Sequence, residues 1–543
     1  MKPLGLRFRR NFCFAAAVAL VVVGVLRIVS TYHVFNQTTD EPCHLACGMQ
    51  WLDQAKYDYD YEDPPLARIA IALGPYLAGL RSTGQPGRVP EGNAILSTGG
   101  HYFHNLALAR MGILPFFVLT CALVWHWSKR LFGSGAALAS VLLFTNLPPV
   151  LAHAALATTD MAGCACMFGS IFCFTLWLER PHTKESLWLG FSLGMAMLAK
   201  FSSLLFLPLC MLMICLLYWI AVRPRTAELV QRLPLALLSA GAALLLIWTG
   251  YRFSYGSMLD DASYSPIHSF TLDQAIGNFS LPAPELFNGL ATVQRHNLVG
   301  HPCWLLGQCS LHGWWYYFPI VLGVKTPIAF LVLCIAGYVF YFRKITRANF
   351  AWQVWVPAAC AILILAAVMP AHINIGVRHI LLIYPLLSIV AGYAVVNLLR
   401  QPNKLAVALC VALIGWQCFV SIRIHPDYLA YFNEFVVGDP SHVLSDSDLD
   451  WGQDLQRLSN KLKQLGVRKV TLLYFGSADI SSFGLPPLEC AAPNQHATGW
   501  VAVSDIVLTV DPGRMQREFA WLASERPVAI VGKSIKLYYI PPR

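Results

Sequence analysis

A dense group of acidic side chains follows the first hydrophobic run of the chain. Between Thr38 and Ala67, the acidic and imidazole side chains are Asp40, Glu41, His44, Asp53, Asp58, Asp60, Glu62 and Asp63. Uncompensated charge next to a hydrophobic segment is costly, and it is usually tied to function. We therefore interpret this stretch as part of a reaction centre.

The pattern Asp40-Glu41-x-x-His44 could carry chemistry on a helix. Residues three and four apart share a helix face, so both carboxylates would lie beside the imidazole. Such a group can bind a divalent cation or act as general base toward a hydroxyl. The alternative is a polar helix start capped by Asp40, which the nearby Pro42 permits.

Two further acidic motifs precede hydrophobic segments. Glu62 and Asp63 stand directly before Pro64 and Pro65, whose rings would hold both acids rigidly at the start of a helix. Asp160 follows two threonines at the mouth of the fourth apolar segment. Each motif also fits an ordinary helix start, because an acid at a helix N-terminus is favoured by the helix dipole.

Basic and imidazole side chains cluster in a later segment, from Gln294 to Pro327, which includes His301 and many aromatics. Aromatics are common at a membrane interface in any case. Lys325 lies inside an apolar stretch, where it needs an anionic partner or a path to water. Together with Lys200 and Arg378 it offers cations that would suit a phosphate.

Composition indicates that these residues are positioned by membrane-spanning helices. The chain is 56% hydrophobic and only 13% charged, with a mean hydropathy of +0.54. Soluble domains have about 25% charged residues. Although the net charge is +10, the Lys and Arg residues fall mostly in short loops between apolar runs, so nucleic acid is not an expected partner.

The apolar runs predict about eleven transmembrane helices by the criterion of roughly 20 apolar residues per span. They lie near residues 12–30, 106–127, 134–151, 161–178, 187–199, 201–221, 234–250, 317–341, 352–370, 380–398 and 404–422. Basic residues occur on every second connection, which predicts a cytoplasmic N-terminus and an extracytoplasmic C-terminal tail. The first run is interpreted as an uncleaved helix, because no small-residue cleavage site follows it.

We predict two parts: a transmembrane module over residues 1–422 and a soluble α/β domain over 423–543. Within the module, residues 31–105 form a first outer loop with juxtamembrane helices, and residues 251–316 form a second large outer loop. In the tail we predict an amphipathic helix over residues 450–465 and three strands, over residues 464–476, 500–508 and 527–540.

Alternating aspartates mark the start of the tail, in the segment SDSDLDWGQDL from Ser445 to Leu455. Alternate carboxylates can ligate calcium, but a calcium loop also needs a glycine at its sixth position and a glutamate at its twelfth. Neither is present. An acceptor-binding or structural role at the domain junction is the favoured interpretation.

Taken in order, these motifs resemble the GT-C superfamily of glycosyltransferases that use a polyprenyl-phosphate sugar donor. The relatives are bacterial counterparts of the protein O-mannosyltransferases and of the aminoarabinose transferase that modifies lipid A. The resemblance rests on Asp40-Glu41, Glu62-Asp63-Pro64-Pro65, Thr159-Asp160 and GMAMLAK ending at Lys200. A bacterial subgroup is similar also in GWWYYFP…KTP and in YLAYFNEFVVG…SDSDLDWGQDL.

The resemblance implies a GT-C-type polytopic α-helical fold with a small C-terminal α/β domain. Asp40 matches the catalytic carboxylate, and Glu41 is grouped with it. Asp160 matches a second acid that helps build the site, in some members through a divalent ion. Asp40 and Asp160 would then hold Mg, Mn or Zn. The substrate-binding candidates are His44, Glu62, Asp63, Lys200, His301, Lys325 and Arg378. At Asp63, the aminoarabinose enzyme instead carries a lysine.

The activity that follows from the resemblance is inverting transfer of a hexose or pentose from the lipid carrier to a protein, lipid or glycan acceptor. The protein would act in the inner cell membrane, with the reaction on the extracytoplasmic side and membrane lipids around its helices. Two alternatives remain open: a flippase or transporter of lipid-linked sugars, and a non-catalytic membrane scaffold.

Overall fold

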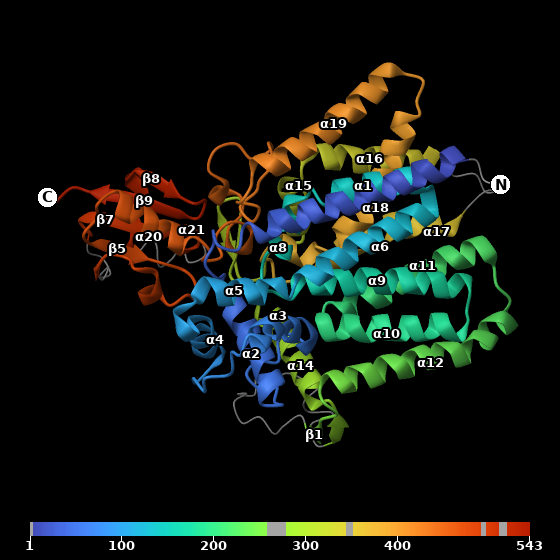
Figure 1. Cartoon of the computed structure of the whole chain (residues 1–543), viewed down its shortest axis with the longest axis horizontal. Helices are drawn as coiled ribbons and strands as arrows, with labels where there is room; N and C mark the ends of the chain where they lie inside the picture. Colours follow the sequence, from blue (N-terminus) through green and yellow to red (C-terminus); the bar gives the residue numbers. More distant parts are fainter. Residues whose placement is uncertain (1–3, 258–278, 344–350, 490–495, 510–517, 543) are drawn as a thin grey trace.

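The computed structural model describes residues 4–257, 279–343, 351–489, 496–509 and 518–542. A bundle of long helices forms the body of the molecule, with the N-terminus at one end and a small sheet at the other (Figure 1). The helices of the bundle are α1 (Leu4–Val29), α6 (Leu114–Phe132), α7 (Ser134–Phe144), α8 (Pro148–Ala154), α9 (Asp160–Glu179), α10 (Thr183–Ala199), α11 (Ser203–Val222), α12 (Thr226–Gly250), α15 (Tyr317–Lys325), α16 (Ile328–Arg343), α17 (Trp352–Val368), α18 (Ile383–Leu399) and α19 (Lys404–Arg423).

All eleven predicted apolar segments are helical, which confirms the fold class. Among the described residues, six helices are long and apolar enough to cross a membrane, or up to eight if each bent pair counts as one span. The shorter apolar helices include α17 and α18. The number of eleven spans therefore stays a prediction.

Two of the predicted spans are broken rather than continuous. The α7–α8 pair is bent by 69° and the α15–α16 pair by 113°. Proline explains both breaks, since it disfavours a helical residue before it and cannot donate a backbone hydrogen bond. Pro148 begins α8, and Pro327 stands between α15 and α16. Both breaks lie toward the end of the bundle that carries the sheet (Figure 1).

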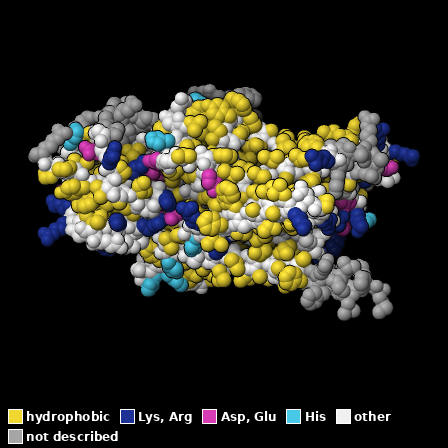
Figure 2. All heavy atoms as spheres, turned by 90° about the horizontal axis from the view of Figure 1, so that it is seen from above, with side chains coloured by type: hydrophobic (Ala, Val, Ile, Leu, Met, Phe, Trp, Pro, Cys, Tyr) yellow, Lys and Arg dark blue, Asp and Glu magenta, His cyan; other side chains and the backbone are white. Residues whose placement is uncertain are grey.

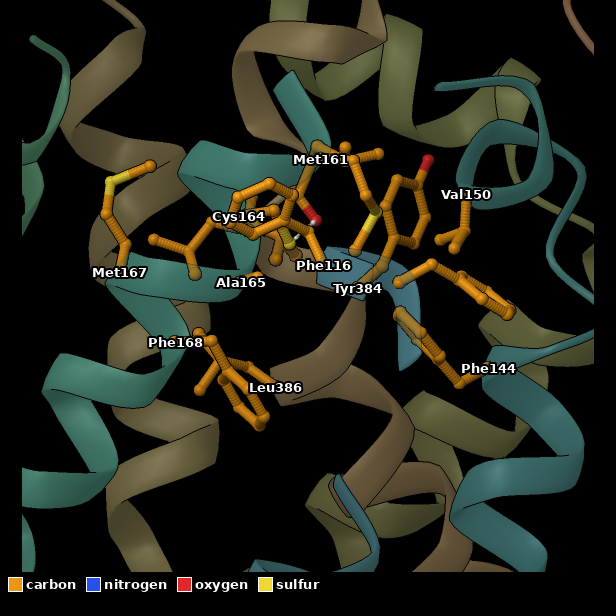
Figure 3. Close-up of a cluster of buried hydrophobic side chains, with 14 of the residues drawn as sticks. Phe116, Phe144, Val150, Met161, Cys164, Ala165, Met167, Phe168, Tyr384 and Leu386 are labelled. Carbon is orange, nitrogen blue, oxygen red and sulfur yellow. Dashed lines mark hydrogen bonds between the residues drawn. The ribbon is translucent and has the colours of Figure 1, made fainter. Parts of the chain in front are cut away.

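The centre of the bundle is formed by α9 and α18, which are apolar on every face. In the most hydrophobic stretch of α9, 83% of the residues are buried. In the corresponding stretches of α1, α12 and α19, only 17% are buried. Figure 3 shows part of this core, where Phe168 of α9 lies beside Leu386 of α18. A helix that is apolar all round packs either in a core or against lipid, so the peripheral helices present a lipid-facing surface.

The outer surface agrees with a membrane protein. Hydrophobic side chains dominate the middle of the face in Figure 2, and Lys and Arg gather toward the end far from the sheet and near the junction with it. Large exposed apolar residues include Leu212, Leu244 and Leu405. Contiguous exposed apolar surface of this extent is unusual for a soluble monomer and is expected in contact with lipid.

Four short helices follow α1 and form a compact unit beside the sheet. They are α2 (Glu41–Asp53), α3 (Pro65–Leu77), α4 (Arg88–Ser97) and α5 (Tyr102–Met111), with the 3-10 turn η1 (Thr98–Gly100) between the last two. Gly48 allows α2 and α3 to approach closely, because a Cβ there would lie 1.9 Å from the Arg68 carbonyl oxygen. The predicted first outer loop is thus largely helical.

The second long connection carries two small hairpins and one helix. Its described elements are β1 (Tyr255–Ser257), β2 (Ser280–Pro282), α14 (Pro284–Val299), β3 (Cys303–Leu305) and β4 (Gln308–Ser310). Strands β1 and β2 pair antiparallel, as do β3 and β4. A short 3-10 turn, η3 (Val377–Ile380), joins α17 to α18 at the same end of the bundle.

The C-terminal part is a mixed sheet in the order β6-β5-β7-β9-β8. Its strands are β5 (Val470–Leu473), β6 (Leu488–Glu489), β7 (Gly499–Ser504), β8 (Ala529–Val531) and β9 (Ile535–Ile540), with helices α20 (Leu455–Gln464) and α21 (Asp505–Thr509) and the 3-10 turns η4 (Pro440–His442), η5 (Asp446–Asp448), η6 (Ile480–Phe483) and η7 (Ala520–Ser524). Strand β5 runs parallel to its neighbours β6 and β7. Strand β9 runs antiparallel to its neighbours β7 and β8.

The predicted small α/β domain is confirmed, with local differences. The expected strand over 527–540 is a hairpin of β8 and β9, because Gly532 takes a positive φ at the turn. The expected strand over 500–508 ends at Ser504, and α21 follows. The helix begins at Leu455 rather than at residue 450. Its Leu455, Leu458 and Leu462 pack against the sheet.

Candidate active site

An ion pair between Asp40 and Arg378 stands where the helical bundle meets the C-terminal part. Asp40 directly precedes α2, and Arg378 lies in η3, 338 residues later. The Arg378 Nη1 atom donates to Asp40 Oδ2 at 2.8 Å. The Asp40 side chain is 34% exposed, against 13% for Arg378. One side of the carboxylate is therefore open to an approaching molecule.

Arg378 is held in place without using all of its donors. Its guanidinium carbon lies 4.4 Å from the centroid of the Trp451 ring. Burial would lower the pKa of Arg378, but Asp40, Asp160 and Asp446 outweigh it and raise the pKa further above its usual value. Its buried Nε atom has no hydrogen-bond partner among the described residues. A guanidinium with a spare donor can bind an additional anion.

The tail segment after Leu444 bonds to the residues that directly precede both partners of this ion pair. On one side, the Thr39 amide donates to the Trp451 carbonyl at 3.0 Å. On the other, the Val377 amide donates to Asp448 Oδ1 at 3.0 Å. Gly376 permits this contact, because its φ is +123° and a Cβ there would lie 2.5 Å from Ser447 Oγ. The tail therefore fixes the relative positions of Asp40 and Arg378.

The tail aspartates do not converge on one point, as a calcium site would require. Asp450 accepts from the amides of Gly452 and Ile506, and Asp454 accepts from Lys533 N and Ser534 Oγ. Asp446 instead lies within electrostatic range of Asp40 and Arg378. These bonds join the sheet to the segment that contacts Arg378, which agrees with the favoured junction role.

Lys325 contributes to the same junction. Its ammonium is buried, with 1% exposure of the residue, and donates to the carbonyls of Leu429 at 2.7 Å and Asp448 at 2.6 Å. It also lies 4.3 Å from the centroid of the Phe432 ring. To bind a donor phosphate it would have to release these carbonyls, so its geometry favours anchoring the tail.

The second predicted acid, Asp160, is paired with a predicted cation. Lys200 donates to Asp160 Oδ1, and Thr158 Oγ1 donates to Oδ2 at 3.0 Å. The imidazole of His153 lies 3.8 Å from the same carboxylate. Lys200 follows α10 and retains 16% exposure. The structure thus brings these two predicted residues together, within electrostatic range of Arg378.

The Glu62-Asp63 motif reaches the same region. Thr159 Oγ1 donates to Asp63 Oδ1 at 3.1 Å, which links this loop to the start of α9. Behind it, Arg68 bonds to the Asp60 carboxylate and lies 3.8 Å from that of Asp63. Burial would raise the pKa of Asp60, but Arg68 and Arg88 lower it to about 2. Sequence reasoning missed Arg68, which organises the loop.

Glu41 and His44 are buried behind the exposed face of Asp40. Both oxygens of Glu41 accept from Arg110, at 2.8 Å each. Arg68 Nε donates to His44 Nδ1 at 3.2 Å. Sequence reasoning overlooked Arg110, although an arginine inside an apolar run needs a buried partner. These contacts favour a positioning role for Glu41 and His44.

Two imidazoles extend the polar region toward the surface. His301 Nε2 lies 4.0 Å from Asp446 Oδ2, and His301 Nδ1 lies 3.1 Å from His296 Nε2. His296 Nδ1 is 3.6 Å from Glu62 Oε1. Burial and the nearby His296 and Arg378 lower the pKa of His301 to about 4, so this imidazole is neutral at pH 7.

The predicted divalent ion finds no ready ligand set in the parts of the chain that the structure describes. No group of three or more His, Cys, Asp or Glu side chains is arranged to hold a metal there. Asp40 faces Arg378 and Asp160 faces Lys200, so each carboxylate is compensated by a cation. This donor set does not fit a dication.

Comparisons with known proteins agree with this architecture. Residues 105–250, about a quarter of the chain, match the family model described as dolichyl-phosphate-mannose-protein mannosyltransferase. No curated protein matches the chain. The archaeal oligosaccharyltransferase AglB from Archaeoglobus fulgidus, in complex with an inhibitory peptide and a dolichol-phosphate, is 10% identical, with a TM-score of 0.50 and coverage of 94% of this chain and 71% of that one.

A second solved structure is also similar over most of this chain. The crystal structure of ArnT from Cupriavidus metallidurans bound to undecaprenyl phosphate is 14% identical and covers 97% of this chain and 99% of its own, with a TM-score of 0.49. At these identities the likeness concerns the fold. Together with the matched segment, the AglB fold confirms the predicted resemblance to the GT-C superfamily of membrane glycosyltransferases.

Proposed function

We propose that this GT-C-type membrane protein transfers a sugar from a polyprenyl-phosphate carrier to a hydroxyl acceptor at the Asp40–Arg378 pair. The observation that carries the proposal is the pair itself: an acid open to solvent, held 2.8 Å from an arginine with a spare buried donor. An acid beside a cation matches a reaction in which a hydroxyl attacks carbon while a phosphate leaves.

Two comparisons support the choice of donor. The family model that matches residues 105–250 is named for a dolichyl-phosphate-mannose enzyme. The AglB structure, whose fold this chain shares, holds a dolichol-phosphate. Both names describe a dolichol chain joined to a phosphate. The lipid chain of such a donor would lie among the apolar helices, with its phosphate at the junction.

In the proposed reaction, Asp40 orients or deprotonates the acceptor hydroxyl. The hydroxyl oxygen forms a bond to the anomeric carbon, the bond from that carbon to the phosphate oxygen breaks, and the electron pair leaves with the phosphate. Attack opposite the leaving group inverts the centre. General-base assistance contributes about 10²–10⁴-fold in rate.

Arg378 and Lys200 are the cations that we assign to the leaving phosphate. Arg378 has an unused donor, and Lys200 retains some exposure beside Asp160. Preorganised positive charge at the leaving group is usually the largest electrostatic contribution to catalysis. Lys325 is assigned to the tail junction instead, because its ammonium already bonds to two carbonyls.

We place the site on the extracytoplasmic side of the inner cell membrane, with the N-terminus in the cytoplasm. The support is the distribution of basic residues, which favour the cytoplasmic side of a membrane protein. Arg130 lies in the last turn of α6, and Arg180 and Arg223 directly follow α9 and α11, whose ends point away from the sheet. The transferred sugar is a hexose or pentose, and the acceptor a protein, lipid or glycan.

The test is sugar transfer by the full chain in vesicles supplied with labelled polyprenyl-phosphate hexoses and pentoses. Asp40→Asn should lower the rate by about 10²–10⁴-fold. The unfolding temperature in detergent should stay close to that of the wild type, because this carboxylate is partly exposed. Near-normal transfer by the variant would remove Asp40 from the mechanism. Movement of the lipid-linked sugar across the bilayer without transfer would favour a flippase.

A further inference from the structure

The proposed reaction has not used Asp446, whose carboxylate lies within electrostatic range of both Asp40 and Arg378. Asp446 begins η5, the first turn of the tail segment that contacts Arg378. Its side chain is 16% exposed. Asp446 Oδ1 accepts from the Ser447 amide at 2.5 Å, and Oδ2 lies toward His301. One oxygen of this nearly buried acid thus remains without a close cation.

Beyond Asp446, a line of titratable side chains leads outward. The successive separations are 4.0 Å to His301, 3.1 Å from His301 to His296 and 3.6 Å from His296 to Glu62. Exposure rises along the line, from 16% at Asp446 to 33% at both imidazoles and 36% at Glu62. The two ring atoms that face inward are both Nε2, and the Nδ1 atom of each ring faces outward.

We propose that Asp446 takes the proton of the acceptor hydroxyl, and that His301, His296 and Glu62 carry this proton to the surface. The inference rests on the proposed sugar transfer and divides the work between two acids. Asp40, paired with Arg378, orients the hydroxyl. Asp446 receives its proton while the hydroxyl oxygen attacks the sugar.

The proton balance along the line is complete. The O–H bond of the acceptor breaks, and its proton goes to the Asp446 carboxylate. Asp446 passes a proton to His301 Nε2, and His301 releases its Nδ1 proton to His296 Nε2. His296 then releases its own Nδ1 proton to Glu62, and Glu62 releases a proton to water. The 4.0 Å step is bridged by one water or closes when the acceptor binds.

The surroundings of Asp446 suit a base that works near neutral pH. Burial, opposed by the Arg378 charge, raises the pKa of Asp446 to about 6. The charged and titratable groups around it are Arg378, Asp40, Asp448, His301, Cys303 and Tyr317. A general base is most effective when its pKa lies close to the working pH. Asp40 is a weaker candidate for this step, because its Oδ2 atom already accepts a hydrogen bond from Arg378.

The backbone at Asp446 provides a clean substitution. Its φ is +59°, a conformation that asparagine adopts as readily as aspartate. Asp446→Asn should therefore fold as the wild type does while losing the proton acceptor. Asp505→Asn is the matched control: burial, opposed by Lys536, raises the pKa of Asp505 also to about 6, but this carboxyl lies in α21 and faces Lys536.

The experiment measures transfer from labelled polyprenyl-phosphate sugars in vesicles between pH 5 and 8. The wild-type rate should fall below about pH 6, where Asp446 becomes protonated. Asp446→Asn should lower the rate at pH 7 by about 10²-fold and should remove this decline. Asp505→Asn should keep the wild-type rate at pH 7 and the decline in rate at lower pH. An Asp446→Asn variant with the wild-type rate and the wild-type pH profile would overturn the proposal.

The relay is tested separately with His296→Ala, which opens a space near the surface. The variant should transfer more slowly, and added imidazole should restore the rate, whereas imidazole should not restore Asp446→Asn. A His296→Ala variant that is fully active, or one that imidazole fails to rescue, would contradict the relay. If the wild type itself transfers no sugar from any of the supplied donors, the proposed function fails instead.

Discussion

Asp40 and Glu41 are neighbours in the sequence, and each pairs with an arginine from a distant segment. The two pairs nevertheless differ in solvent exposure and in the number of hydrogen bonds to the carboxylate. Glu41 and Arg110 are 1% exposed, and the carboxylate accepts five hydrogen bonds from Arg110, Thr38 and Ala157. Asp40 has one contact with Arg378 and is 34% exposed.

This difference assigns separate roles to the two acids. A buried pair with all its hydrogen bonds made holds structure, since removing one partner leaves an uncompensated charge. A partly exposed acid with a single contact can exchange that contact for a substrate. We therefore propose that Glu41 fixes the loop that places Asp40 and that Asp40 meets the ligand. The following substitutions test this contrast, beginning with the largest effect.

Removing the buried acid should affect folding most. In Glu41→Ala, Arg110 keeps its charge inside the protein without a carboxylate, which costs about 3–5 kcal/mol in the free energy of unfolding. Thermal unfolding in detergent measures the effect, with Asp53→Ala, an acid at the other end of α2, as control. A Glu41→Ala protein as stable as the wild type would contradict the structural role of Glu41.

Arg378, the partner of the exposed acid, should affect transfer more than folding. Arg378→Met removes one preorganised charge, which costs about 10²–10³-fold in rate when such a group stabilises the transition state. The free energy of unfolding should change by less than in Glu41→Ala. Arg378→Lys, which keeps the charge without the planar fork, should recover part of the rate. A fully active Arg378→Met variant would contradict the assignment.

Lys325→Met separates anchoring from phosphate binding. The substitution leaves the Leu429 and Asp448 carbonyls without their donor, at about 1–3 kcal/mol in the free energy of unfolding. The affinity for polyprenyl phosphate, measured by calorimetry in detergent, should stay unchanged. A large loss of that affinity with normal stability would restore Lys325 as a phosphate ligand.

The smallest effect is expected at Glu62. It is 36% exposed, and its nearest basic side chains are Arg88 at 3.8 Å and His296 at 3.6 Å. Exposed pairs of this kind contribute about 0–1 kcal/mol. Glu62→Gln should therefore unfold like the wild type and slow transfer only slightly. A loss of stability comparable to that in Glu41→Ala would show that exposure does not distinguish the two classes of acid.

The sequence predicted the helices well because hydropathy is a local property. Each apolar run became a helix, and the fold class was confirmed. The breaks before Pro148 and near Pro327 were not predicted, although both prolines were visible. The run lengths concealed them: 134–151 and 317–341 each had the length of one span.

The site was predicted in its residue types more than in its pairings. Asp40, Asp160, Lys200 and Arg378 were all singled out as charges, and the structure brings them to one region. Which acid meets which cation depends on tertiary contacts across up to 338 residues, which local pattern does not encode. Arg110 and Arg68 were missed because the burial of their partners, Glu41 and Asp60, depends on tertiary packing that the local sequence does not encode.

The central claim is that Asp40 serves chemistry while Glu41 serves structure, and two matched amide variants test it most directly. Transfer rate and unfolding temperature are measured for Asp40→Asn and Glu41→Gln in the same membranes. The account predicts a stable but nearly inactive Asp40→Asn and a destabilised Glu41→Gln, whose remaining folded fraction still transfers sugar. A stable, inactive Glu41→Gln beside a fully active Asp40→Asn would contradict it.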